Sequence, residues 1–61
     1  MNKEELIAKW GKETLSEVVF WEEVETSQPF FYKAKQIAEG AKIDLKDAED
    51  ALRDYQCYKE V

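Results

Sequence analysis

The chain has 61 residues, of which 44% are apolar and 38% charged, and its net charge is −5. Its length allows one small domain over residues 1–61, and its composition is too apolar for a disordered chain and too interrupted by charge for a membrane span. The N-terminal residues are charged and no apolar stretch follows them, so we expect no secretory signal. We therefore expect a cytoplasmic protein, or one from the interior of a host cell.

The residue types on which most catalytic and metal sites depend are scarce. Histidine is absent and Cys57 is the only cysteine, which excludes an internal disulfide and a tetrahedral zinc set. Gly11 and Gly40 are isolated, so there is no glycine-rich phosphate loop, and a single arginine, Arg53, argues against direct nucleic-acid binding. We expect no catalytic residue, metal, cofactor or small-molecule substrate, and hence no enzyme.

The first segment, residues 2–12, has the pattern of an amphipathic helix. Asn2 is a suitable N-cap, Leu6 and Trp10 share one face, and Gly11 can end the helix. A second helical pattern follows over residues 12–26. The first half of the chain is therefore either one long helical arm or two helices that meet at Gly11.

The run Val18-Val19-Phe20-Trp21 leaves a strand as an alternative within this arm, because its residues are β-branched or aromatic. Two arguments favour the helix. Glutamates, which are good helix formers, flank the run on both sides. A strand would also leave a large apolar face exposed in a sheet of very few strands.

A turn is predicted over residues 26–29, since Pro29 disfavours helix at Gln28 and suits the first position of a new helix. Beyond it, apolar residues recur at alternating spacings of four and three. This alanine-rich seam consists of Ala34, Ala38, Ala41, Leu45, Ala48, Leu52 and Tyr55. Such a heptad repeat is typical of helices that pack along one another.

Two interpretations fit residues 29–58. The unbroken heptad phase favours a single helix of roughly 45 Å, which is longer than a compact chain of this size is wide. The alternative is a break near Gly40 and a new helix capped by Asp44. We favour the single helix, and thus an all-α hairpin of two long arms that oligomerises into a helical bundle, with a dimer as the expected state.

Function is expected to be protein binding, as an accessory subunit, assembly factor or regulator that acts through the aromatic residues near the turn and through the alanine-rich seam. The candidate apolar contacts are Phe20, Trp21, Phe30 and Phe31. The candidate orienting charges are Glu22, Glu23 and Glu25. In the simpler interpretation of these residues, Phe20 packs within a dimer or against the N-terminal helix.

The acidic residues suggest a second function, an inhibitor that imitates nucleic-acid phosphates and occupies a basic groove of a DNA- or RNA-binding protein. A second row of carboxylates, from Asp44, Asp47, Asp50 and Asp54, is better explained as a solvated helix face balanced by Lys46 and Arg53, since calcium-loop glycine and iron-binding histidine are missing. Cys57 has no nearby base and is expected to be incidental.

Overall fold

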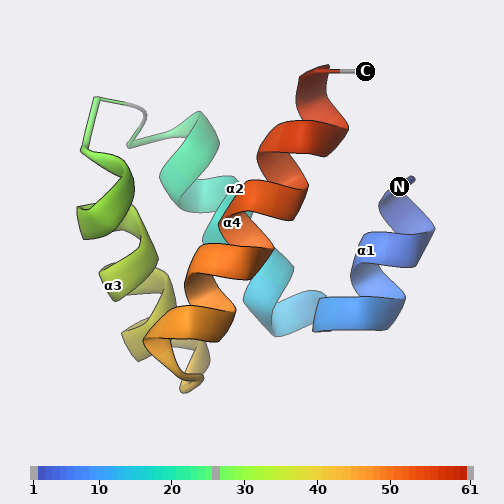
Figure 1. Ribbon diagram of the computed structural model, residues 1–61, viewed down its shortest axis with the longest axis horizontal. Coiled ribbons are helices and arrows are strands. Elements are labelled where there is room, and N and C mark those ends of the chain that lie inside the picture. Colours follow the sequence, from blue (N-terminus) through green and yellow to red (C-terminus); the bar gives the residue numbers. More distant parts are fainter. Residues whose placement is uncertain (1, 26, 61) are drawn as a thin grey trace.

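Four helices follow one another in the computed structural model, which describes residues 2–25 and 27–60 (Figure 1). They are α1 (Lys3–Trp10), α2 (Lys12–Glu23), α3 (Phe30–Ala41) and α4 (Leu45–Glu60). The described residues form no strand, so the all-α prediction is confirmed and the strand alternative for the run after Glu17 is wrong. The predicted turn is seen from Ser27 onward, whereas Thr26 lies outside the described residues.

Local sequence signals set the ends of α1. The Asn2 side chain accepts a hydrogen bond from the Glu5 backbone N–H at 2.8 Å, and the Glu5 carboxylate accepts one from the Asn2 N–H at 3.0 Å. This reciprocal pair is a capping box. Gly11 ends the helix at φ 90° and ψ 157°, a conformation that is accessible almost only to glycine. The first arm is therefore two helices that meet at Gly11.

The prediction of one long helix over residues 29–58 is wrong. The chain leaves α3 at Lys42, which adopts the left-handed conformation (φ 58°, ψ 48°), and helix resumes at Leu45 after Asp44. The Ile43 N–H donates to the Ala38 carbonyl at 3.0 Å, which closes the helix end. The left-handed residue costs about 1–2 kcal/mol, less than the chain gains by folding α4 back over α3.

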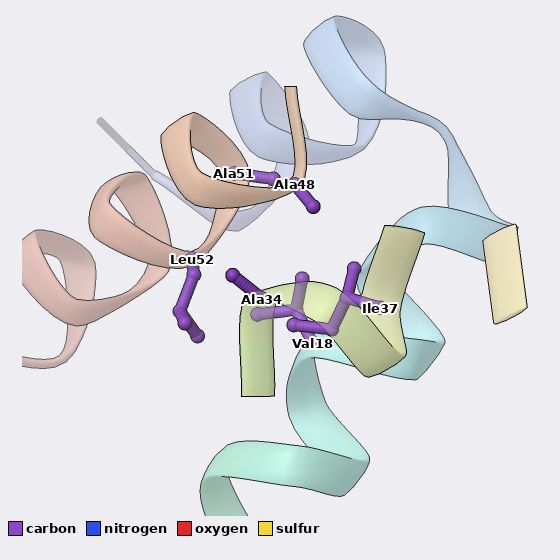
Figure 2. Packing of buried hydrophobic residues seen from close by; sticks show 6 residues of the cluster. All are labelled: Val18, Ala34, Ile37, Ala48, Ala51 and Leu52. Atoms are coloured by element: carbon purple, nitrogen blue, oxygen red, sulfur yellow. The ribbon is translucent and has the colours of Figure 1, made fainter. Parts of the chain in front are cut away.

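Burial of apolar side chains in the core provides the free energy gained when α4 folds back over α3 (Figure 2). Val18 of α2 packs against α3 and α4, and burial of each large aliphatic side chain contributes about 1.5–3 kcal/mol. The fully buried cluster consists of Val18, Ala34, Ile37, Ala48, Ala51 and Leu52. Most of the alanine-rich seam thus packs inside one chain, because α4 reverses the direction of α3 (Figure 1), although Leu45 of the seam stays exposed.

The dimensions of the chain match those of a compact monomer. Its radius of gyration is 10.2 Å, and the usual scaling for 61 residues gives about 10.5 Å. Its accessible surface is 4174 Å², against about 4,100 Å² expected for a folded monomer of this mass. These are the dimensions of a compact chain, in which the second predicted arm is divided into α3 and α4 and the first is broken at Gly11, the alternative left open from the sequence.

The left-handed residue between α3 and α4 supports a stability prediction. We expect Lys42→Gly to raise the free energy of unfolding by about 0.5–1 kcal/mol, because glycine adopts this conformation without strain at some entropic cost in the unfolded chain. Lys42→Ala is the control, since it removes the same charge but keeps the Cβ atom. Urea unfolding followed by circular dichroism measures both, and equal stabilities of the two variants would contradict the explanation.

Candidate functional site

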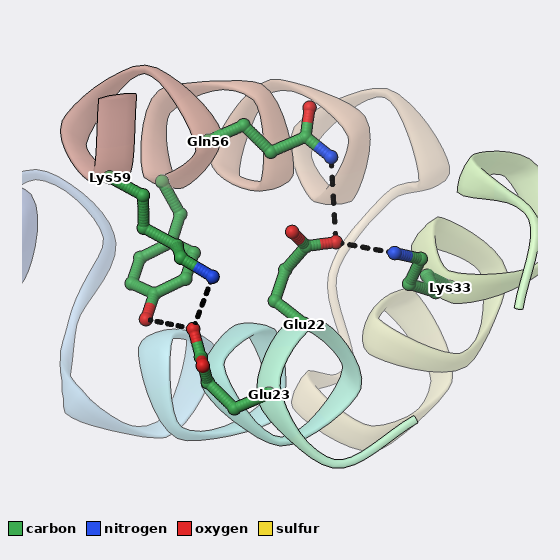
Figure 3. A network of polar contacts seen from close by, with 6 residues as sticks. Glu22, Glu23, Lys33, Gln56 and Lys59 are labelled. Atoms are coloured by element: carbon green, nitrogen blue, oxygen red, sulfur yellow. Dashed lines mark hydrogen bonds and ion pairs between the residues drawn. The ribbon is translucent and has the colours of Figure 1, made fainter. Parts of the chain in front are cut away.

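A polar network joins α2 to α3 and α4 where sequence analysis placed the orienting charges (Figure 3). The Lys33 ammonium lies 2.6 Å from Glu22 Oε1, and the two side chains are only 9% and 10% exposed. The Gln56 amide lies 3.4 Å from the same carboxylate oxygen. Glu22 and Lys33 therefore form a largely buried ion pair, and the Glu22 carboxylate is occupied within the chain.

Glu23 is also engaged, but at the surface. Its carboxylate accepts hydrogen bonds from the Lys59 ammonium at 2.6 Å and from the Tyr55 hydroxyl at 3.1 Å. The hydrogen bond from Lys59, then that from Tyr55, holds the pKa of Glu23 below its usual value. Of the three predicted acidic residues, only the half-buried Glu25, in the turn after α2, lies outside this network.

The aromatic residues near the turn divide into a packed group and an exposed group. Trp21 and Phe30 pack against the core, and the Arg53 guanidinium lies 5.3 Å from the centre of the Phe30 ring. Phe20 is 44% exposed and Phe31 64% exposed. Val18 and Trp21 thus pack toward α3, while Phe20 and Phe31 remain on the surface.

Phe20 lines a groove that was not predicted from the sequence. The groove has a volume of about 660 Å³ and lies between α1, α2 and α4. Its apolar lining consists of Leu6, Ile7, Leu15, Val19, Phe20, Tyr55 and Tyr58. Its polar lining consists of Lys3, Lys12 and Ser16, which are all exposed. This concave surface is formed by residues of three helices, α1, α2 and α4, so it cannot be predicted from neighbouring residues in the sequence.

A second polar contact holds α1 in place as one wall of the groove. The Asp54 carboxylate on α4 accepts hydrogen bonds from the Lys9 ammonium and from the Trp10 indole N–H, both at 2.9 Å. Burial opposes ionisation of Asp54, but these two hydrogen bonds outweigh it and keep the pKa of the carboxyl below its usual value. The contact joins segments more than forty residues apart in the sequence.

This contact predicts a pH dependence of stability. Because the pKa of Asp54 is lowered on folding, its contribution is present above the unfolded pKa of about 4 and disappears as the pH falls below it. We expect Asp54→Ala to lower the free energy of unfolding by about 1–2 kcal/mol at pH 7, and the difference from wild type to shrink toward pH 2. Urea titrations over this range test it, and a difference that does not change with pH would contradict it.

Unlike Asp54, the other three aspartates of the predicted row behave as a solvated face. Asp44 and Asp47 are exposed, and Asp50 lies 3.6 Å from the Arg53 guanidinium in an exposed pair. Among the residues that the structure describes, no group of three or more potential ligands is arranged to hold a metal ion. Cys57 is a free, exposed thiol on the same helix.

Comparison of the chain with protein-family models, with curated proteins and with solved structures finds no match. Over the described ranges, none of the helices has the length and apolarity needed to cross a bilayer. The fold and the site together define a small, all-α, four-helix domain with an apolar surface groove.

Proposed function

We propose that this chain is a small protein-interaction module that binds its partner through the groove between α1, α2 and α4. The observation that carries the proposal is the groove itself, an apolar concavity with Phe20 at its edge on a chain that is otherwise rich in charge. Exposed apolar surface rimmed by polar residues is typical of sites where another macromolecule docks. The partner-binding role first assigned to Phe20 is kept in this proposal.

The proposal differs from the sequence-based one in which residues contact the partner. Trp21, Phe30 and Glu22 stabilise the fold, and most of the alanine-rich seam is buried in the contact of α3 with α4. Phe31 stays exposed as a candidate for a second contact. The internal pairing of Glu22 and Glu23 leaves fewer free carboxylates for imitation of nucleic-acid phosphates, so we do not put the inhibitor forward.

Site-specific photo-crosslinking tests the proposal. A photoreactive phenylalanine derivative replaces Phe20 in one variant and the exposed Glu39 of α3 in a control variant, and each is irradiated in cells that naturally contain the protein. We expect a discrete crosslinked species from position 20 and none of that mass from position 39. Identical patterns from both positions, or no crosslink from either, would refute a binding role for the groove.

The same experiment distinguishes a foreign partner from self-association. A crosslinked product of twice the chain mass would identify a second copy as the occupant of the groove. Light scattering of the purified chain provides the independent check. We expect a monomer, because the central apolar cluster is covered by helices of the same chain.

A further inference from the structure

The charge at the rim of the groove is opposite to that of the whole molecule. The chain carries a net charge of −5, yet the charged residues in the groove lining are Lys3 and Lys12, and no acidic residue is among them. In the part of the chain that the structure describes, neither lysine forms an ion pair, whereas Lys9, Lys33 and Lys59 all do. Two ammonium groups therefore stand free beside an apolar floor.

The occupants that fit this surface are restricted by its shape and charge. The polar groups are exposed at the margin rather than converging on a buried point, which is unlike a small-molecule pocket. A second copy placed by two-fold symmetry would bring this patch against the same patch of its neighbour, and thus lysines toward lysines. A separate segment with apolar anchors and acidic flanking residues would contact the apolar floor and pair with the lysines at the rim.

We infer that the groove binds an amphipathic helix whose apolar stripe is flanked by acidic residues. This inference rests on the proposed function. The eight residues of α1 are about 12 Å long, so a wall of this length faces about two turns of a bound helix. Anchors at i, i+4 and i+7 would contact the floor formed by Leu15, Val19 and the α4 tyrosines. Carboxylates beside that stripe would reach Lys3 and Lys12.

Two synthetic peptides test the inference. Both are helical, of about 14 residues, and share one stripe of leucine and phenylalanine, but one carries glutamates beside the stripe and the other lysines. Each is titrated into the ¹⁵N-labelled protein while amide chemical shifts are recorded. We expect the acidic peptide to bind about fivefold more tightly, as two exposed ion pairs allow, and to shift amides that line the groove.

This expectation opposes the one from net charge, which favours the lysine peptide for an acidic protein. Lys3→Glu combined with Lys12→Glu should reverse the preference. Lys35→Glu combined with Lys46→Glu is the matched control, because these lysines are exposed, lie outside the groove lining and change the net charge equally. The control should keep the preference for the acidic peptide, and its amide spectrum should show that the fold is intact.

Three results would overturn the inference: equal affinity for both peptides, tighter binding of the lysine peptide, or shifts confined to residues outside the groove. Failure of the inference is distinguishable from failure of the proposed function. If Phe20 crosslinks to a partner while the peptides show no acidic preference, the groove binds a protein of another chemistry. If the acidic preference is found but no crosslink from Phe20 forms in cells, the groove has the inferred chemistry without the proposed cellular role.

Discussion

Glu22→Ala is expected to lower the free energy of unfolding by about 3–5 kcal/mol, which is the usual cost of removing one partner of a buried ion pair. The reason is the Lys33 ammonium, which lies 2.6 Å from the Glu22 carboxylate with a side chain only 9% exposed. Without Glu22, the positive charge of Lys33 stays in a site that is largely shielded from water. A domain of this size has little more than about 3–5 kcal/mol to lose, so most chains should unfold.

The double variant Glu22→Leu with Lys33→Met separates the charge effect from packing. Replacing both charges by apolar side chains of similar volume leaves no buried ion, so we expect stability equal to wild type or higher. Urea unfolding followed by the fluorescence of Trp10 and Trp21 measures both variants. A loss below about 1 kcal/mol for Glu22→Ala would show that the Lys33 ammonium reaches water, and would contradict the buried-pair explanation.

Leu6→Ala is expected to release α1 while the other helices stay folded. Leu6 is the fully buried anchor of this helix, at 1% exposure, and truncation of a buried leucine costs about 2–5 kcal/mol. However, Leu6 lies outside the central cluster of α2, α3 and α4. The lost energy should therefore appear as local opening, and the groove should lose one of its walls.

Native-state hydrogen exchange distinguishes local from global loss. In Leu6→Ala, amides of α1 should exchange faster while those of α4 keep most of their protection. Ile37→Ala is the control, because Ile37 lies in the central cluster and its truncation should accelerate exchange in every helix by a similar free energy. Equal acceleration of α1 and α4 amides in Leu6→Ala would contradict the independence of α1.

Loss of α1 also connects stability to the proposed function. If the groove binds the partner, Leu6→Ala should weaken the crosslink from Phe20, although Phe20 itself lies on α2, which remains folded. Peptide binding should weaken in parallel. A Leu6→Ala protein that opens α1 and still binds the acidic peptide would show that α2 and α4 suffice for the contact.

Much of the local structure could be predicted from neighbouring residues alone. The cap at Asn2, the break at Gly11 and the start of α3 directly after Pro29 depend on backbone preferences and on hydrogen bonds within a few positions. The contact of Val18 with Ala34 and Ile37 was also predictable, since a short turn between two amphipathic helices brings their apolar faces together. These features are decided by interactions close in sequence.

The end of α3 was not predictable in this way. Glycine costs a helix only about 1 kcal/mol relative to alanine. This cost was too small to decide between a break near Gly40 and the single helix that the uninterrupted heptad phase favoured over residues 29–58. What decided it was the burial gained when Leu52 and its neighbours on α4 fold back onto Ala34 and Ile37. That gain exists only in the assembled fold.

The candidate site follows the same division. Composition and spacing alone determined an all-α chain rich in acidic residues and marked Phe20 as a candidate apolar contact. Tertiary structure decided that Glu22 pairs with Lys33, that Asp54 holds Lys9 and Trp10, and that three helices enclose a groove. The physical reason is that helical periodicity is local, whereas the partner of a charge and the far wall of a groove come from segments that only packing brings together.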